Sequence, residues 1–164
     1  MTVVAKSVDD DYPELSVVAR RGYGGLTIFW KKEIDDKIKV MDEGNSRIQV
    51  IQMDTNASPI CLINVYMPSD NKEMDCEYKD MISQLTEVIE KYRNTHEIII
   101  CGDMNGSAHR DKTSHDPLFK KFLLENRIGL SIHYPEKDTF YHHNGKSSGQ
   151  IDYIISTCKN ILKR

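Results

Sequence analysis

The sequence predicts a single domain of the α/β (α+β) class with its polar residues at strand ends. Three observations predict it: short β-branched runs separated by turn residues, one long stretch with helical periodicity, and an apolar strand at 97–101 that stops at Asp103 and Asn105. A chain of 164 residues suits one domain with a buried core. No repeat or linker divides it, so we expect one domain over residues 1–164.

Four strands are expected before the first helix, at 24–30, 38–42, 47–54 and 59–68. Each is a β-branched or aromatic run bounded by Gly, Asn, Asp or Ser, which are turn-forming residues. Strands that follow one another with only short turns between them pair most simply as an antiparallel meander. We therefore predict that these four strands form one sheet.

Two helices follow from periodicity and capping. Residues 70–93 carry apolar side chains at steps of three and four with charges between them, which is typical of an amphipathic helix. After the strand at 97–101, Asp116 is predicted to cap a second helix that has Pro117 at its first position. Short runs at 130–134, 139–143 and 149–156 have strand character.

Composition excludes several classes of protein. No apolar run approaches the roughly 18 residues of a membrane helix, and the start of the chain has no secretory signal. The four cysteines lack metal-type spacing, so we expect free thiols and an intracellular protein, cytoplasmic or nuclear. The net charge of −3 gives no general attraction for nucleic acid, so any such binding must be local.

Polar side chains stand at the ends of three predicted strands. Tyr66 precedes a proline, Asp103 and Asn105 follow the strand at 97–101, and Asp152 lies in or near the last strand. Each has an ordinary structural explanation alone: packing, a turn cap, or closure of a hairpin. Their joint occurrence favours a site instead, and we predict that the four side chains gather in one cleft.

The motifs that contain these residues are "NVYMPSD", "GDMNGSAHRDK" and "DTFYHHNGKSSGQIDYII". In this order they resemble the endonuclease/exonuclease/phosphatase (DNase-like) superfamily. The further stretches "RGYGGLTIFWKK" and "LFKKFLLEN" are similar to the endonuclease domain of non-LTR retrotransposons, which precedes a reverse transcriptase. The resemblance implies a DNase-like four-layer αββα sandwich, DNA as substrate, magnesium as cofactor and a possible reverse transcriptase domain as partner.

The resemblance also implies roles for single residues. Asp103 would handle the attacking water and bind magnesium, Asn105 would steady Asp103 and the phosphate, and Tyr66 would hydrogen-bond the phosphate. Asp152 matches an aspartate that orients a catalytic histidine. The expected supporting and substrate-positioning residues are Asn64, Ser69, Gly102, Thr139, His109 and Arg110, while Met104 is expected in the core.

Two parts of the family pattern lie outside the matched stretches. The magnesium-binding glutamate of the family lies farther upstream of Tyr66 than this chain reaches, and its terminal Ser-Asp-His lies beyond the last strand here. We therefore expect a fragment incomplete at both ends, with weak metal binding by Asp103 and crippled catalysis. We do not expect Glu14, His142 or His143 to replace the missing groups.

The function implied is magnesium-dependent nicking of DNA by an endonuclease of retrotransposon type. One alternative within the same fold is a phosphatase acting on inositol phosphates. Another is a non-catalytic fragment or interaction module from a decayed element. We further expect the loop at 109–112 to form part of the rim of the cleft, and the sheet to show an uncovered edge with apolar side chains beside it.

Overall fold

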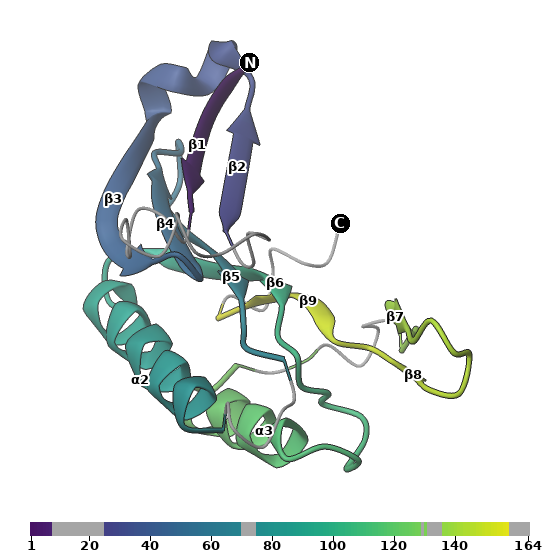
Figure 1. Ribbon diagram of the computed structural model, residues 1–164. Helices are drawn as coiled ribbons and strands as arrows, with labels where there is room; N and C mark the ends of the chain where they lie inside the picture. The colour runs from purple at the N-terminus through teal and green to yellow at the C-terminus, as the bar shows by residue number, and fades with distance from the viewer. Residues whose placement is uncertain (8–24, 70–74, 129, 131–135, 158–164) are drawn as a thin grey trace.

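The computed structural model describes residues 1–7, 25–69, 75–128, 130 and 136–157. These residues form a mixed α/β structure, as expected (Figure 1). The elements in chain order are β1 (Thr2–Lys6), β2 (Leu26–Trp30), the 3-10 helix η1 (Lys32–Lys37), β3 (Ile38–Asn45), β4 (Ile48–Met53), β5 (Ile60–Tyr66), α2 (Asp75–Tyr92), β6 (Glu97–Asp103), α3 (His115–Glu125), β7 (Phe140–Tyr141), β8 (Ser148–Gly149) and β9 (Asp152–Ser156).

The centre of the fold is a five-stranded sheet with the order β3-β4-β5-β6-β9. Three of its pairings are antiparallel, and β5 and β6 run parallel because helix α2 connects them across one face. The parallel pairing brings the carboxyl ends of β5 and β6 to the same edge of the sheet. This edge carries most of the residues that the sequence predicts to be functional.

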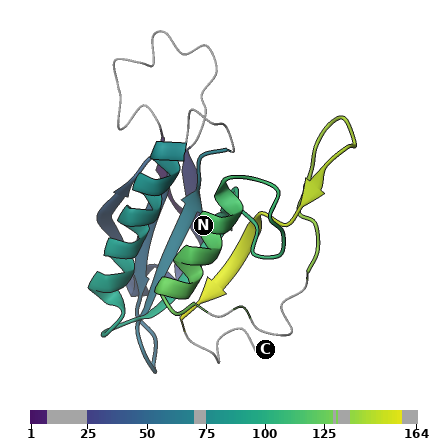
Figure 2. The ribbon, with the colours of Figure 1, turned by 90° about the horizontal axis from the view of Figure 1, so that it is seen from below.

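Helices α2 and α3 lie side by side on one face of the sheet (Figure 2). The small β1–β2 sheet lies on the other face, where β2 contacts β4 and β5. Asn64 shows this arrangement directly, because it points away from the helices and its Nδ2 donates to the carbonyl oxygen of Thr27 in β2, 3.5 Å away. The described residues thus form three layers, namely helices, central sheet and small sheet.

The core fills the space between the helices and the central sheet. Alternate residues of β5, β6 and β9 point into it, and the apolar stripe of α2 faces them. Met104 is 1% exposed, which confirms its expected place in the core. The largest fully buried side chains include Tyr78, Tyr153, Phe119, Phe122, Ile48, Ile63 and Ile98.

The predicted four-stranded meander is wrong in one respect. The strand expected at 24–30 forms as β2, but it pairs with β1 rather than with β3. Strand β1 was not anticipated from the sequence. A period-two pattern indicates a strand without indicating its partner, and the meander is therefore limited to β3, β4 and β5.

The helices form close to their predicted positions. Helix α2 starts at Asp75, and residues 70–74 of the predicted helix lie outside the described residues. The N-cap of α3 is Ser114, so Asp116 is not the cap and Pro117 is not at the first helical position. Residues 131–134 of the predicted strand at 130–134 also lie outside the described residues, as do Glu14 and Cys158.

The prediction of an uncovered sheet edge stays a prediction, because in the described part of the chain the structure shows only that β3 and β9 are the outer strands of the central sheet. Strand β9 is the last strand in the order, and Ile154 on it is 54% exposed. Tyr153 and Ile155 point to the helices, so the side chain of Ile154 lies on the opposite face of the central sheet.

Within the described part of the chain, no helix has the length and apolar character needed to cross a bilayer.

Candidate functional site

Three of the predicted site residues form one row across the central sheet. Tyr66 at the end of β5 is the register partner of Asp103 in β6, and Asp103 is the register partner of Asp152 in β9. Directly paired residues place their side chains on the same face of a sheet, with Cα atoms about 5 Å apart in an antiparallel pair. Residues far apart in the sequence are therefore neighbours here.

Gly102 allows this row to form. Its φ is +130°, and a Cβ at this position would lie 2.0 Å from the carbonyl oxygen of Val65 in β5. Any other residue would push β5 and β6 apart just before Asp103. The close approach of the two strands thus requires a glycine at position 102.

Asn105 joins the ends of β5 and β6. Its backbone has a φ of 44°, which asparagine tolerates better than most residues, and its N–H donates to Asp103 Oδ1 at 2.8 Å. Its Nδ2 donates to the carbonyl oxygen of Met67 at 2.7 Å, and the N–H of Met67 donates to the carbonyl oxygen of Asp103 at 2.9 Å. The turn after β6 therefore fixes the Asp103 carboxylate.

A pocket of about 530 Å³ opens beside this turn. One side carries Asp103, Asn105 and Tyr66, and the others come from the loop after β6 and from the β7–β8 hairpin, which projects beyond the sheet in Figure 1. The structure thus brings three of the four predicted catalytic residues together. The lining residues are Tyr66, Ser69, Asp103, Asn105, Arg110, Lys112, Thr113, Phe140, His142, Ser147, Ser148 and Ile151.

Asp152 lines a neighbouring pocket, together with Gly102 and Thr139. The hydroxyl of Thr139 accepts the backbone N–H groups of Ile151 and Asp152, both at 3.1 Å. This gives Thr139 a physical role, because it holds the start of β9 and with it the backbone of Asp152. Asp152 itself is exposed, and its charge acts on Asp103 across the β6–β9 pair.

The electrostatics of Asp103 are unusual for a carboxylate. Burial raises the pKa of Asp103 to about 6, against the lowering effect of the hydrogen bond from Asn105, and the negative charge of Asp152 adds to the rise. A carboxylate that is half-buried beside a second carboxylate is an environment that a cation would stabilise. A pKa near 6 also suits a general base at neutral pH.

The described residues contain no group of three or more His, Cys, Asp and Glu side chains placed to hold a metal ion. Magnesium is nevertheless often bound through one or two carboxylates, with water and substrate phosphate supplying the other oxygens. The neighbouring Asp103 and Asp152 fit this minimal requirement. They are the residues in this part of the chain that would hold the ion.

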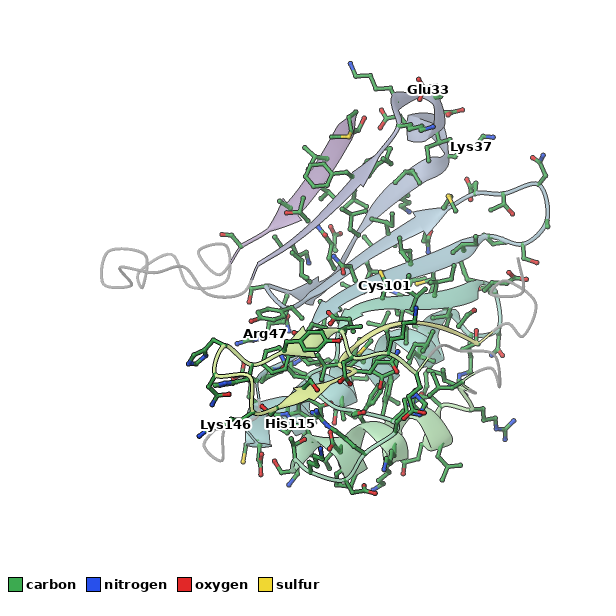
Figure 3. All side chains as sticks on the ribbon, turned by 90° about the vertical axis from the view of Figure 1, so that its right-hand side faces the viewer. Glu33, Lys37, Arg47, Cys101, His115 and Lys146 are labelled. Atoms are coloured by element: carbon green, nitrogen blue, oxygen red, sulfur yellow. The ribbon has the colours of Figure 1, made fainter. Side chains whose placement is uncertain are left out.

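Two further residues contact the site without having been predicted to do so. His142 was not among the residues expected in the site, but its half-buried ring lines the pocket. Its Nδ1 accepts the N–H of Asn144 at 3.3 Å, which leaves Nε2 as the protonated nitrogen of the neutral ring. Arg47, labelled in Figure 3, lies with its guanidinium carbon 5.5 Å from the centre of the Tyr66 ring.

Other predicted residues divide between the pocket and its surroundings. Ser69 and Arg110 line the pocket, and Lys112 joins them, so the loop at 109–112 forms part of its rim as expected. His109 is exposed and lines neither this pocket nor the neighbouring one. Asn64 lines neither, because its side chain bridges to β2.

The sequence matches the model of a family described as Endonuclease-reverse transcriptase over residues 60–163. A search of the curated proteins finds no significant match. The match to the family covers more than half of the chain, including β5, β6, β9 and both pockets.

Several solved structures are similar in fold. The chain resembles the endonuclease domain of TRAS1, a telomere-specific non-LTR retrotransposon, with a TM-score of 0.64 and 15% identity over 98% of this chain and 68% of that one. It also resembles the AP endonuclease LMAP from Leishmania major, with a TM-score of 0.63 and 14% identity over 94% of this chain and 69% of that one. The chain thus spans about two thirds of the length of either structure. The likeness shows a DNase-like sandwich fold.

Proposed function

The chain belongs to the Endonuclease-reverse transcriptase family, and on that basis we propose that its pocket hydrolyses phosphodiester bonds and nicks DNA. The observation that supports this most strongly is the row of Tyr66, Asp103 and Asp152 at the ends of three adjacent strands. Cationic side chains, Arg110 and Lys112, line the same pocket as Asp103 and suit an anionic substrate.

The reaction needs an oriented water, neutralised phosphate oxygens and a proton for the leaving oxygen. Asp103 would accept the proton of the attacking water, and its pKa of about 6 leaves it mostly ionised at neutral pH. The Tyr66 hydroxyl would donate to a non-bridging oxygen of the phosphate. His142 lines the same pocket, and its Nε2–H would donate a hydrogen bond to the leaving oxygen, which would take its proton from water.

Magnesium, when bound, would neutralise charge on the phosphate oxygens. Asp103 and Asp152 would hold it, and Thr139 would keep Asp152 in place through the backbone of β9. Two carboxylates are a small ligand set, so we propose that the ion binds weakly in the absence of substrate phosphate. Turnover by the chain alone is accordingly proposed to be slow.

Nicking of supercoiled plasmid tests the proposal. The purified chain should convert supercoiled plasmid to open circles in the presence of magnesium, and Asp103→Ala should abolish the conversion. Asp111→Ala is the matched control, because Asp111 is exposed, bonds Lys120 and lines neither pocket. Equal nicking by the Asp103→Ala variant would refute the assignment.

Inositol polyphosphates should be offered in parallel. Release of phosphate from them by a chain that does not nick DNA would favour the phosphatase alternative. A folded chain that acts on neither substrate would favour a non-catalytic interaction module.

A further inference from the structure

The loop between β6 and α3 is folded around one buried carboxylate. The side chain of Asp116 is 0% exposed. It accepts backbone N–H groups from Ser107 at 2.8 Å, Lys112 at 2.8 Å and Thr113 at 3.1 Å. These bonds set the path of the loop, so the side chains that it directs toward the pocket start from a fixed backbone.

Arg110 connects this loop to the opposite wall of the pocket. Its Nε donates to Asp116 Oδ2 at 3.2 Å, and its Nη1 donates to the carbonyl oxygen of Ser148 in β8 at 3.2 Å. A guanidinium has five N–H groups. The remaining ones form no hydrogen bond with the described residues, and the side chain lines the pocket.

Gly149 makes the position of Arg110 possible. A Cβ at Gly149 would lie 1.8 Å from Arg110 Nη1 and 2.7 Å from its guanidinium carbon. The backbone of Gly149 does not have a positive φ, so an alanine would meet no backbone strain there. The glycine therefore leaves room for the guanidinium, and a single methyl group can displace Arg110 without changing any charge.

We propose that Arg110, together with Lys112, forms a second phosphate subsite, which binds a phosphate next to the one held by Tyr66, Asp103 and Asn105. The inference rests on the proposed function and adds to it that two adjacent phosphates of one strand bind the pocket. A guanidinium that is already oriented by Asp116 and Ser148 loses little side-chain entropy on binding, and its free donors match phosphate oxygens.

Binding of a fluorescein-labelled DNA duplex, followed by anisotropy, tests the subsite. Asp103→Asn serves as the parent chain so that the duplex is not cleaved. One lost phosphate contact reduces the slope of log K against log salt by about 0.9, which corresponds to an about eightfold loss of affinity at about 0.1 M salt. Arg110→Met should show this loss and this change of slope.

Gly149→Ala should reproduce the effect of Arg110→Met and should add nothing when the two are combined. Lys120→Met is the matched control, because Lys120 is a cation that pairs with Asp111 and does not line the pocket. It should leave the slope unchanged. Thermal melts of all variants identify any loss of affinity that comes from unfolding.

Unchanged salt slopes in Arg110→Met and Gly149→Ala would overturn the subsite and leave Arg110 as a structural bridge only. A parent chain that binds no duplex would instead contradict the proposed function. In that case inorganic phosphate should still shift the Nε–H resonance of Arg110 in ¹H–¹⁵N spectra if the subsite exists. The absence of that shift would overturn the subsite as well.

Discussion

Replacing Asp103 by asparagine should stabilise the protein, although it removes the proposed catalytic base. Burial raises the pKa of Asp103 from 3.8 to about 6, and a shift of about two units corresponds to at most about 3 kcal/mol. Solvent reaches part of the carboxylate, so screening reduces this to about 1–2 kcal/mol. Asparagine keeps an oxygen that can accept the N–H of Asn105, so the turn is retained.

The pH dependence gives this prediction its sign. The folded protein binds the Asp103 proton more tightly than the unfolded chain does. The protonated carboxyl therefore adds its full contribution to the free energy of unfolding below about pH 4, and this contribution is lost as the pH rises to about 6. Asp103→Asn should therefore melt about 2–6 °C above the parent protein at about pH 7.5. The difference should vanish toward about pH 4.

Thermal unfolding followed by circular dichroism at several pH values measures the effect. Asp111→Asn is the control, because Asp111 is exposed and the same substitution there should leave the melting temperature nearly unchanged. A variant that melts at or below the parent at neutral pH would refute the reasoning. So would a stabilisation that does not depend on pH, because it could not arise from the charge of Asp103.

Three further predictions concern neighbouring positions. Asp152→Asn should lower the pKa of Asp103 in a ¹³C NMR titration, since a like charge is removed, and an unchanged pKa would contradict the coupling across β6 and β9. Thr139→Val should reduce the free energy of unfolding in urea by about 1–3 kcal/mol, because the N–H groups of Ile151 and Asp152 lose their acceptor, whereas Thr139→Ser should retain most of it. Ile154→Lys should reduce self-association in analytical ultracentrifugation, because it replaces an apolar side chain that is 54% exposed with a charged one, and equal self-association of parent and variant would contradict this.

Much of the architecture could be predicted from local patterns. β-Branched runs that end in polar residues placed Tyr66, Asp103 and Asp152 at strand ends, and the structure has all three in strands of one sheet. The pairing of the strands could not be predicted in the same way. Nothing in the run at 26–30 distinguishes a strand of the central sheet from one that pairs with β1, because both need the same alternation.

The parts of the site that the sequence did not predict depend on contacts between distant segments. An aspartate before a proline is typical of a helix start, yet the Asp116 carboxylate accepts N–H groups of the preceding loop instead. His142 faces the pocket because a short hairpin turns it inward. Arg47 reaches Tyr66 because β4 and β5 are paired, and no local pattern marks that contact.

The ionisation of Asp103 in the presence of magnesium and a phosphodiester tests the central claim most directly. A ¹³C NMR titration of the aspartate carboxyl groups measures it, with a short phosphorothioate-containing duplex that is cleaved slowly. A cation held by Asp103 and Asp152 against the phosphate should lower the pKa of Asp103 clearly below its value of about 6 in the free protein. An Asp103 pKa that stays at about 6 while the duplex is bound would contradict the claim that this pocket binds and hydrolyses a phosphodiester.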